Sequence, residues 1–497
     1  MRLTRRSLMA TVYGAGLAAC APAAVAPASV PEASHDLPDA TQLASMIRSK
    51  EISAAEAVEE AIRRAEAIQP QINFLVTDTF AMAREKAKAP VSGPFGGVPF
   101  LVKDLDNVAG VVTRYGSASS ASAPPAEKDD TFVAAMFTAG LICIGKSAAP
   151  ENGYLPTTEP LAFAPSKNPW DTTRSTAGSS GGAGAATAAG VVPMAHANDG
   201  GGSIRLPAAN NGLVGLKPSR GRMISEQPGA RPLDLGVEGV VSRTVRDTAG
   251  FFAATEATGA AAVFAPVGLV TGASKTRLKV GVLSKGFGGF EAQTEVAGIL
   301  QATAKLLETA GHTMVGQTTW PTAPTFGDDF LAYWSLGAAQ GVADVEKMLG
   351  KKADETVVEP FTLTMAANAA KLKPADIDAI QQRLLAAAAA YDEWIKGFDV
   401  VISPVFASPP SPLGYLRGDV PFDTLRERLL QEVGYTLIHN ISGAPAMCLP
   451  MGWTTSGLPV GIQFSGANGA EKMLLELAYE IEAAQPWIGR KPKVWAG

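Results

Sequence analysis

The chain has 497 residues, of which 46% are hydrophobic and 18% charged, the composition of a globular protein that is long enough to bury a large core. The formal net charge of -5 excludes the basic field that nucleic-acid binding requires. Three cysteines and four histidines lie far apart without a CxxC or HExxH spacing, so we expect neither a metal site nor a disulfide framework.

The N-terminus carries the pattern of an export signal. Residues 4–9 (TRRSLM) resemble a twin-arginine signal, and the apolar stretch 8–19 is too short to span a membrane. The sequence LAAC, which ends at Cys20, resembles a lipobox, whereas residues 24–26 offer a competing cleavage site. We therefore expect residues 1–38 to be an export signal and tether. The protein would be a membrane-anchored lipoprotein or, slightly less favoured, a soluble periplasmic protein; a leader without export role is the alternative.

Further along the chain, apolar periodicity predicts alternating strands and helices. Ser53 and Glu56 have the spacing of a capping box between two helices. Short apolar runs predict strands at 98–102, 141–144, 191–195, 278–283, 398–403, 446–450 and 461–464. Helical periodicity predicts helices within 39–69 and at 132–139, 183–189, 294–310 and 472–484, and a helix-rich insert at about 329–397.

This alternation predicts an α/β fold with a large mixed, mostly parallel central sheet covered by helices on both faces. No internal repeat or inter-domain linker interrupts residues 39–497, so we expect a single catalytic domain there.

Two standard motifs occur in the sequence, but the residues in and around them do not fit the structures that these motifs require. Residues 140–147 fit a P-loop pattern, yet the four middle residues have the character of a buried strand, so we interpret the match as chance. Ser180 sits in a GxSxG pattern, but the residues before it are polar and turn-like, whereas a nucleophile elbow follows an apolar strand.

Two runs rich in glycine and serine are stronger candidates for a site. They cover residues 177–184 and 198–203 and enclose a predicted helix and strand. Glycine-rich segments let backbone N–H groups approach a ligand closely, so two such runs could form one concave site. A flexible glycine loop is the competing interpretation for each run taken alone.

The span 178–222 resembles the amidase signature family. Further matches in the same order are residues 102–104 (VKD), 239–247, 398–404 and 443–463, so the resemblance extends from about residue 40 to the C-terminus. It implies the α/β fold of that family and hydrolysis of amides.

The resemblance also implies a Ser–cis-Ser–Lys triad. Ser203 would be the nucleophile, Ser179, 24 residues earlier, the bridging serine behind a cis peptide, and Lys103 the base. A serine hydroxyl needs a base to become a nucleophile, and lysine can be that base when burial keeps it neutral. Ser179 would pass the proton between them.

The glycine loop would supply the oxyanion hole, through the backbone N–H groups of Gly200, Gly201, Gly202 and Ser203. We expect Asp199 and Arg205 to brace this loop as an ion pair rather than to contact substrate. His196 and His439 are interpreted as structural histidines rather than as the base of a Ser-His-Asp site.

Some residues depart from the common family pattern. Asn198 and Gly200 stand at variable places in the loop, which predicts a more mobile loop. The neighbouring segments 157–160 and 167–170 are similar to the branch that contains 6-aminohexanoate cyclic dimer hydrolase, with aryl acylamidases and urethane-cleaving members as neighbours.

Together these observations predict an amidase that hydrolyses a small carboxylic amide through an acyl-enzyme, without a metal or organic cofactor. Residues 151–155 and 329–397 would form the pocket walls, and the protein would be a monomer or homodimer that binds no nucleic acid. An esterase or urethanase with the same triad is the first alternative. A transamidation-type subunit and a non-catalytic lipoprotein are the others.

Overall fold

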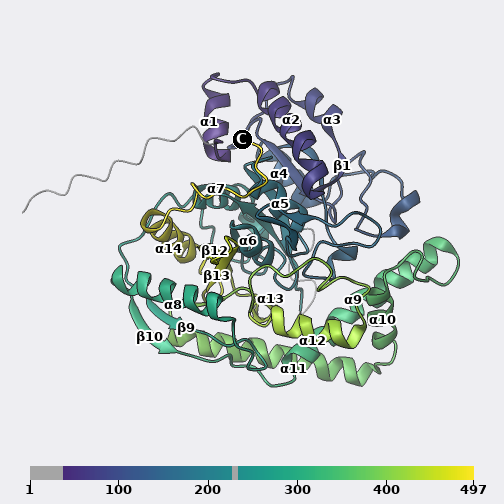
Figure 1. The fold of residues 1–497 in the computed structure, drawn as a ribbon, viewed down its shortest axis with the longest axis vertical. Helices are drawn as coiled ribbons and strands as arrows, with labels where there is room; N and C mark the ends of the chain where they lie inside the picture. Colours follow the sequence, from purple (N-terminus) through teal and green to yellow (C-terminus); the bar gives the residue numbers. More distant parts are fainter. Residues whose placement is uncertain (1–36, 226–232) are drawn as a thin grey trace, which may run out of the picture. The chain divides into compact units, whose positions relative to one another are not determined.

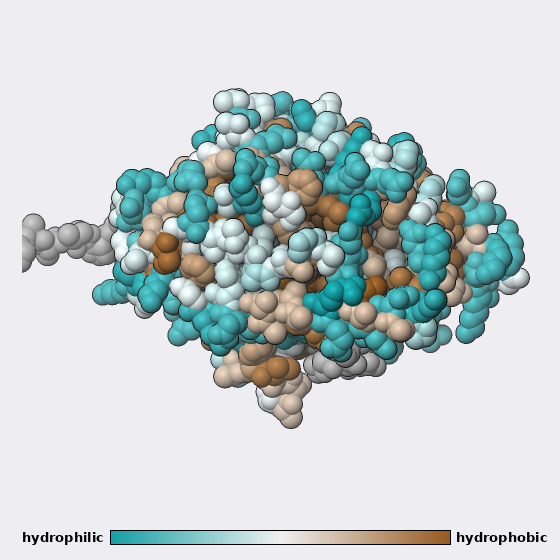
Figure 2. All heavy atoms as spheres, turned by 90° about the horizontal axis from the view of Figure 1, so that it is seen from below, coloured by the Kyte–Doolittle hydropathy of each residue, from teal (hydrophilic) through white to brown (hydrophobic). Residues whose placement is uncertain are grey.

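The computed structural model describes residues 37–225 and 233–497, and the chain from Leu37 onward forms one compact unit. The expected export signal and lipobox therefore lie outside the described residues. Within the described part, no helix is both long and apolar enough to cross a membrane. The face shown in Figure 2 mixes hydrophilic side chains with small hydrophobic areas.

Eight strands form the central sheet, in the order β10-β9-β11-β13-β12-β7-β8-β6 (Figure 1). Their bounds are β6 Met194–Asp199, β7 Val214–Lys217, β8 Val237–Ser242, β9 Lys279–Val282, β10 Thr313–Gln317, β11 Val400–Pro404, β12 Ala446–Trp453 and β13 Pro459–Ser465. The pairs β10–β9 and β9–β11 are parallel, and the other five neighbouring pairs are antiparallel. The prediction of a mixed sheet is confirmed, but the prediction that it is mostly parallel is wrong.

The strand connections explain the difference. The helix α6 (Arg205–Asn211) links β6 to β7 as a crossover between strands that run the same way, yet β8 inserts between them in the opposite direction. β12 and β13 are joined by a short turn and form a hairpin, which places an antiparallel pair in the middle of the sheet. An apolar segment of the sequence indicates that a strand is buried, but it does not indicate the direction of that strand in the sheet.

Helices cover both faces of the sheet, as predicted. Along β11, the side chain of Val401 packs into one core while those of Val400 and Ile402 pack into the other. On the Val401 side lie α6 and α5 Gly181–Ala188, α11 Pro374–Trp394 and α13 Leu437–Ser442. The same core extends to α2 Ala54–Ile72 and α3 Phe80–Lys86, which contact the strand Ile142–Ser147 of a smaller sheet. On the other side lie α1 Ala40–Arg48, α4 Thr131–Thr138, α7 Val245–Thr255, α8 Thr294–Thr309 and α14 Glu471–Ala484.

A third apolar cluster lies over the end of the glycine loop. It joins α9 (Phe326–Leu349), α10 (Pro360–Ala369) and α12 (Phe422–Glu432) to Leu155 in the loop after β3 (Ile142–Ser147). In Figure 1 these three helices lie close together. The helix-rich segment expected at 329–397 thus consists of α9, α10 and α11.

A smaller sheet carries the predicted base. Its strand order is β1-β3-β2, with β1 at Leu75–Asp78, β2 at Pro99–Lys103 and β3 at Ile142–Ser147. Every residue of β2 and β3 is buried, so the P-loop match at 140–147 is a strand, as interpreted. A separate two-stranded ribbon pairs β4 (Lys167–Asn168) with β5 (Asp171–Ser175).

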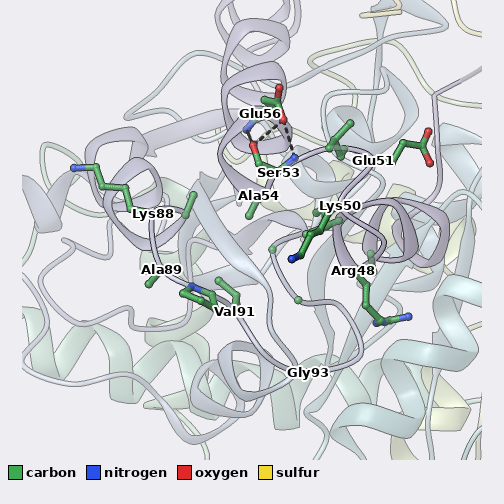
Figure 3. Close-up of a pocket in the computed structure, with 17 residues that line it drawn as sticks. Arg48, Lys50, Glu51, Ser53, Ala54, Glu56, Lys88, Ala89, Val91 and Gly93 are labelled. Carbon is green, nitrogen blue, oxygen red and sulfur yellow. Dashed lines mark hydrogen bonds between the residues drawn. The ribbon is translucent and has the colours of Figure 1, made fainter.

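The capping box predicted at the start of α2 is present. The Ser53 hydroxyl accepts from the Glu56 N–H, and the Glu56 carboxylate accepts from the Ser53 N–H at 2.7 Å (Figure 3). Two otherwise unpaired N–H groups of the helix start are satisfied by this exchange.

Candidate active site

Lys103, the last residue of β2, is fully buried and points at Ser179. Its Nζ lies 2.7 Å from the Ser179 Oγ and 2.6 Å from the Asn198 Oδ1. The backbone of β2 is tied to β6 because the Lys103 N–H donates to the Nδ1 of His196 at 3.2 Å. The strand therefore holds the lysine where the bridging serine was expected.

Burial lowers the pKa of Lys103 to about 8, and the negative charges of Asp106, Glu238 and Asp199 partly oppose this shift. An ammonium loses its hydration in a buried site, so the neutral amine is favoured. An appreciable fraction of Lys103 is therefore neutral near pH 8, and a neutral amine can accept a proton.

Ser179 follows a cis peptide bond after Gly178, as the resemblance implied. A Cβ at position 178 would lie 2.6 Å from the backbone of Thr157, so only glycine fits there. The Ser179 Oγ lies close to Gly153, because a Cβ at that glycine would be 3.2 Å from it. Gly153 belongs to the pocket that Ser203 also lines.

Ser203 stands in the turn between β6 and α6, with 9% of its surface exposed to the pocket. The turn requires glycine before it, since Gly202 has φ +136° and a Cβ there would contact Leu206 and Thr436 at 2.7 Å. In the described part of the chain no hydrogen bond joins Ser203 to Ser179. Such contacts are often long in unliganded enzymes and tighten with substrate.

The Asp199–Arg205 ion pair expected to brace the loop is present and fully buried, at 3.0 Å. Burial disfavours the Asp199 charge, but the charge of Arg205 and its hydrogen bonds bring the pKa of this carboxyl below its usual value. Asp199 also accepts from the Gly202 N–H at 2.7 Å and the Ile204 N–H at 3.1 Å.

This contact corrects one prediction for the oxyanion hole. The Gly202 N–H is already bonded to Asp199 and points into the loop rather than at the pocket. Within the described residues, the N–H groups of Gly200, Gly201 and Ser203 have no protein hydrogen-bond partner, so they are the donors that a substrate oxygen could meet.

The pocket beside Ser203 is apolar, and aromatic side chains from α9 form much of it. Trp334 stacks on Phe330 and meets Tyr154 edge-on. A Cβ at Gly200 would lie 2.8 Å from the Trp334 ring, so the glycine lets this ring rest directly on the loop. The loop is therefore packed, whereas Gly200 had predicted mobility. The lining residues are Gly153, Tyr154, Leu155, Pro156, Gly201, Ser203, Leu206, Phe330, Leu331, Trp334, Phe361, Leu429, Leu430, Val433 and Leu437.

Comparison with known proteins agrees with this geometry. The sequence model of the family described as Amidase matches residues 56–475. The chain belongs to the amidase signature family. As a member, it is a hydrolase of carbon–nitrogen bonds other than peptide bonds.

Two relatives and two solved structures show how far the likeness to this amidase extends. A putative amidase AmiC of Mycobacterium leprae is 39% identical over 90% of this chain and 95% of its own. The 6-aminohexanoate-cyclic-dimer hydrolase of Paenarthrobacter ureafaciens is 34% identical over 92% and 96%. A structure of 6-aminohexanoate cyclic dimer hydrolase complexed with substrate has a TM-score of 0.85 at 31% identity, covering 92% and 99% of the two chains. A bacterial aryl acylamidase structure has a TM-score of 0.81 at 25% identity, covering 91% and 97%.

Next to Lys103 the amidase carries a cluster of the buried His196 and the partly exposed Asp106 and Glu238, whose ligand atoms all lie within 4.8 Å of one another. That spacing would suit a cation, but the imidazole is already used by the protein. Its Nδ1 accepts from the Lys103 N–H, so the proton sits on Nε2, which lies 2.8 Å from Glu238 and donates to it. Both ring nitrogens are occupied, and burial lowers the pKa of His196 to about 4.

The two histidines near the site are structural, as interpreted. His196 ties β2 to β6 and β8 in the way just described, and neither of its ring nitrogens contacts a serine. The Nδ1 of His439 lies 3.1 Å from Arg205, and the ring is buried behind the glycine loop. Neither arrangement is that of a Ser-His-Asp triad.

A larger groove of the amidase lies between α1, α2 and the loop after α3 (Figure 3). Basic Arg48, Lys50 and Lys88 and acidic Glu51 line it together, and its serine is the capping residue Ser53. Neither Ser179 nor Ser203 lines this groove, so it is distinct from the candidate active site.

The predicted pocket walls are confirmed at Gly153–Leu155 and on α9 and α10, but sequence reasoning missed the contribution of α12 and α13. Leu429, Leu430, Val433 and Leu437 complete the apolar wall. Leu429 and Leu430 lie on α12, Val433 follows its end, and Leu437 begins α13. Apolar spacing in the sequence could have indicated a helix here, but it gives no indication that two successive helices meet at a pocket.

Proposed function

We propose that this amidase hydrolyses a small carboxylic amide with an apolar group next to the carbonyl, using Ser203 as nucleophile, Ser179 as bridge and Lys103 as base. The observation that carries the proposal is the buried 2.7 Å contact between the Lys103 Nζ and the Ser179 Oγ, at the edge of the apolar pocket that contains Ser203.

The reaction follows from the placement of these groups. The Ser203 Oγ attacks the carbonyl carbon while its proton passes to Ser179, and the Ser179 proton passes to the neutral Lys103. The developing oxyanion meets the free N–H groups of Gly200, Gly201 and Ser203. Collapse breaks the carbon–nitrogen bond, and the leaving amine takes the proton back through Ser179. Water then attacks the acyl-enzyme by the same path and regenerates Ser203.

The substrate class is inferred from the pocket and the relatives. Apolar and aromatic side chains surround Ser203, and none of the described residues that line the pocket carries a charge. A charged group beside the carbonyl would lose its hydration there without gaining a partner. Relatives named as hydrolases of a cyclic amide dimer and of aryl amides support a small uncharged amide.

A matched panel tests the proposal. Hexanoyl 4-nitroanilide, the corresponding 4-nitrophenyl ester and a carbamate share the apolar part and differ in the bond that is broken. We expect anilide turnover, and Ser203→Ala to reduce it by roughly 10⁴-fold or more. The buried Ser465 in β13 provides a control, and Ser465→Ala should retain activity. Turnover of the ester or carbamate alone would identify an esterase or urethanase, and anilide turnover by Ser203→Ala would refute the nucleophile.

A further inference from the structure

Asn198, the residue before Asp199 in β6, contacts the candidate base twice. The Lys103 Nζ lies 2.6 Å from the Asn198 Oδ1 and 3.4 Å from the Asn198 backbone oxygen. Its third close neighbour is the Ser179 Oγ at 2.7 Å. The amine nitrogen is therefore surrounded by three oxygens, two of which belong to one asparagine.

A neutral amine has two N–H groups and one lone pair. Neither Asn198 oxygen can donate a proton, so each can only accept an N–H from Lys103. With both N–H groups so occupied, the lone pair is left to face the hydroxyl of Ser179. That is the orientation in which Lys103 can take a proton from the bridging serine.

The orientation of the Asn198 amide is fixed in turn by Asp106. The Asn198 Nδ2 donates to the Asp106 Oδ2 at 3.1 Å, and a carboxylate oxygen can only accept from it. The amide oxygen must therefore point the other way, toward Lys103. The backbone oxygen of Asn198 is held by strand pairing opposite Glu238 and by the Ser180 hydroxyl at 3.3 Å.

We propose that Asn198 is a positioning residue for Lys103, with Asp106 holding its amide so that the lysine lone pair faces Ser179. This inference rests on the proposed function, since it concerns how the same base is prepared for the same reaction. Neither Asn198 nor Asp106 is among the described residues that line the substrate pocket.

Titratable side chains surround the hydrogen-bonded series Lys103–Asn198–Asp106, in which Asp106 follows β2. They are His196 and Asp199 on β6 and Glu238 on β8, with Asp130 and Lys146 beyond them. Burial raises the pKa of Asp106 to about 7 and that of Glu238 to about 7. Because Lys103 is fully buried and its Nζ contacts Asn198 directly, an added charge at position 198 acts strongly on Lys103.

The test separates orientation from mere support of the fold. Asn198→Asp keeps an oxygen against the Lys103 Nζ but adds a negative charge that favours the ammonium. We expect the rise of rate with pH to move up by about one to three pH units, with the plateau at high pH retained. Asn198→Leu has a similar size but no side-chain oxygen, and should lower the plateau about 10–100-fold. Asp106→Asn removes a negative charge and should move the rise to lower pH.

The readout is the rate at which a fluorophosphonate labels Ser203, measured from pH 6 to pH 10. In that reaction the serine oxygen bonds to phosphorus, fluoride leaves and the serine proton goes to Lys103 through Ser179. Labelling needs no amide substrate, so a protein that labels but hydrolyses no amide would overturn the proposed function and not this inference.

Asn73→Asp is the matched control, because Asn73 also donates its amide to an oxygen, that of Pro165, outside the site. It should leave the pH profile unchanged, and thermal unfolding checks that each variant is folded. A rise at the same pH in wild type, Asn198→Asp and Asp106→Asn would overturn the inference. So would an Asn198→Leu plateau equal to that of wild type. If Asn198→Asp does not fold, the Asp106→Asn shift and the Asn198→Leu plateau decide.

Discussion

At the scale of single residues, three buried lysines show that residue type alone does not identify a base. Lys146 lies 3.2 Å from Asp104 and donates to Thr113, and Lys217 donates to the Pro218 carbonyl oxygen. Burial also lowers the pKa of Lys217 to about 7, yet no serine hydroxyl is among its hydrogen-bond partners in the described residues. Lys103 differs because its amine meets Ser179, so contact and not pKa distinguishes it.

The pKa of Lys103 leads to a prediction about pH. The neutral amine is the active form, so wild-type activity should rise as pH increases through about 8 and then level off. Lys103→Ala should lower kcat/KM about 10²–10⁴-fold at pH 8 and lose this rise. Added methylamine should restore part of the activity by filling the space of the missing side chain. A pH–rate profile that is the same in both proteins would exclude Lys103 as the base.

Much of the site could be predicted because short segments of the sequence resemble those of the amidase signature family, and the resemblance implied the triad. The cis peptide at Ser179, the Asp199–Arg205 pair and the burial of Lys103 match the expectations. The hydrogen bond from the Gly202 N–H to Asp199 could not be predicted, because the sequence does not indicate which acceptor a backbone N–H binds. The contact between Asn198 and Lys103 joins residues 95 positions apart, and no periodic pattern in the sequence indicates such a contact.

At the scale of elements, strands were predicted better than their directions. β2, β11 and β13 were found because each is a fully buried apolar run. β7 was missed because it is short, and β8 because the polar Glu238 interrupts it. The strand expected at 191–195 is shifted to β6, where the buried His196 and Asp199 and the half-buried Asn198 are polar residues that a hydropathy pattern places outside a strand.

The helix α9 should determine which acyl groups are accepted. Trp334 lies on Gly200 and forms the wall beside Ser203, so Trp334→Ala should lower kcat/KM for a hexanoyl anilide about 10–100-fold. The effect on an acetyl anilide should be smaller, because a short acyl group does not reach the ring. Met348 at the far end of the same helix is 55% exposed, and Met348→Ala is the control. Equal losses for both anilides would contradict this role.

At the scale of the whole molecule, we propose that the amidase is exported and held at a membrane through a lipid on Cys20. The proposal comes from the twin-arginine pattern at residues 4–9 and the LAAC sequence, which lie outside the described residues. The lipid on Cys20 would then anchor the catalytic domain to the membrane, and the domain would bind its small-molecule substrate outside the cytoplasm.

Cell fractionation tests the location. Cys20→Ser should move the amidase from the membrane fraction to the soluble periplasmic fraction, because the lipid-bearing thiol is lost. Cys143→Ser changes a buried cysteine of β3 and should leave the distribution as in wild type. An unchanged distribution for Cys20→Ser would favour the soluble protein cleaved near residue 26.

The β12–β13 hairpin has a consequence for how the protein is made. It lies between the half-sheet β10-β9-β11 and the half-sheet β7-β8-β6, although its residues, 446–465, are synthesised after those of the other six strands. Until the ribosome has released them, the edges of β11 and β7 have no partner and expose unpaired N–H and C=O groups. The sheet is therefore completed only after residues 446–465 have been synthesised. A secretion route that accepts finished, folded chains would suit such a protein better than one that threads it while it is being translated.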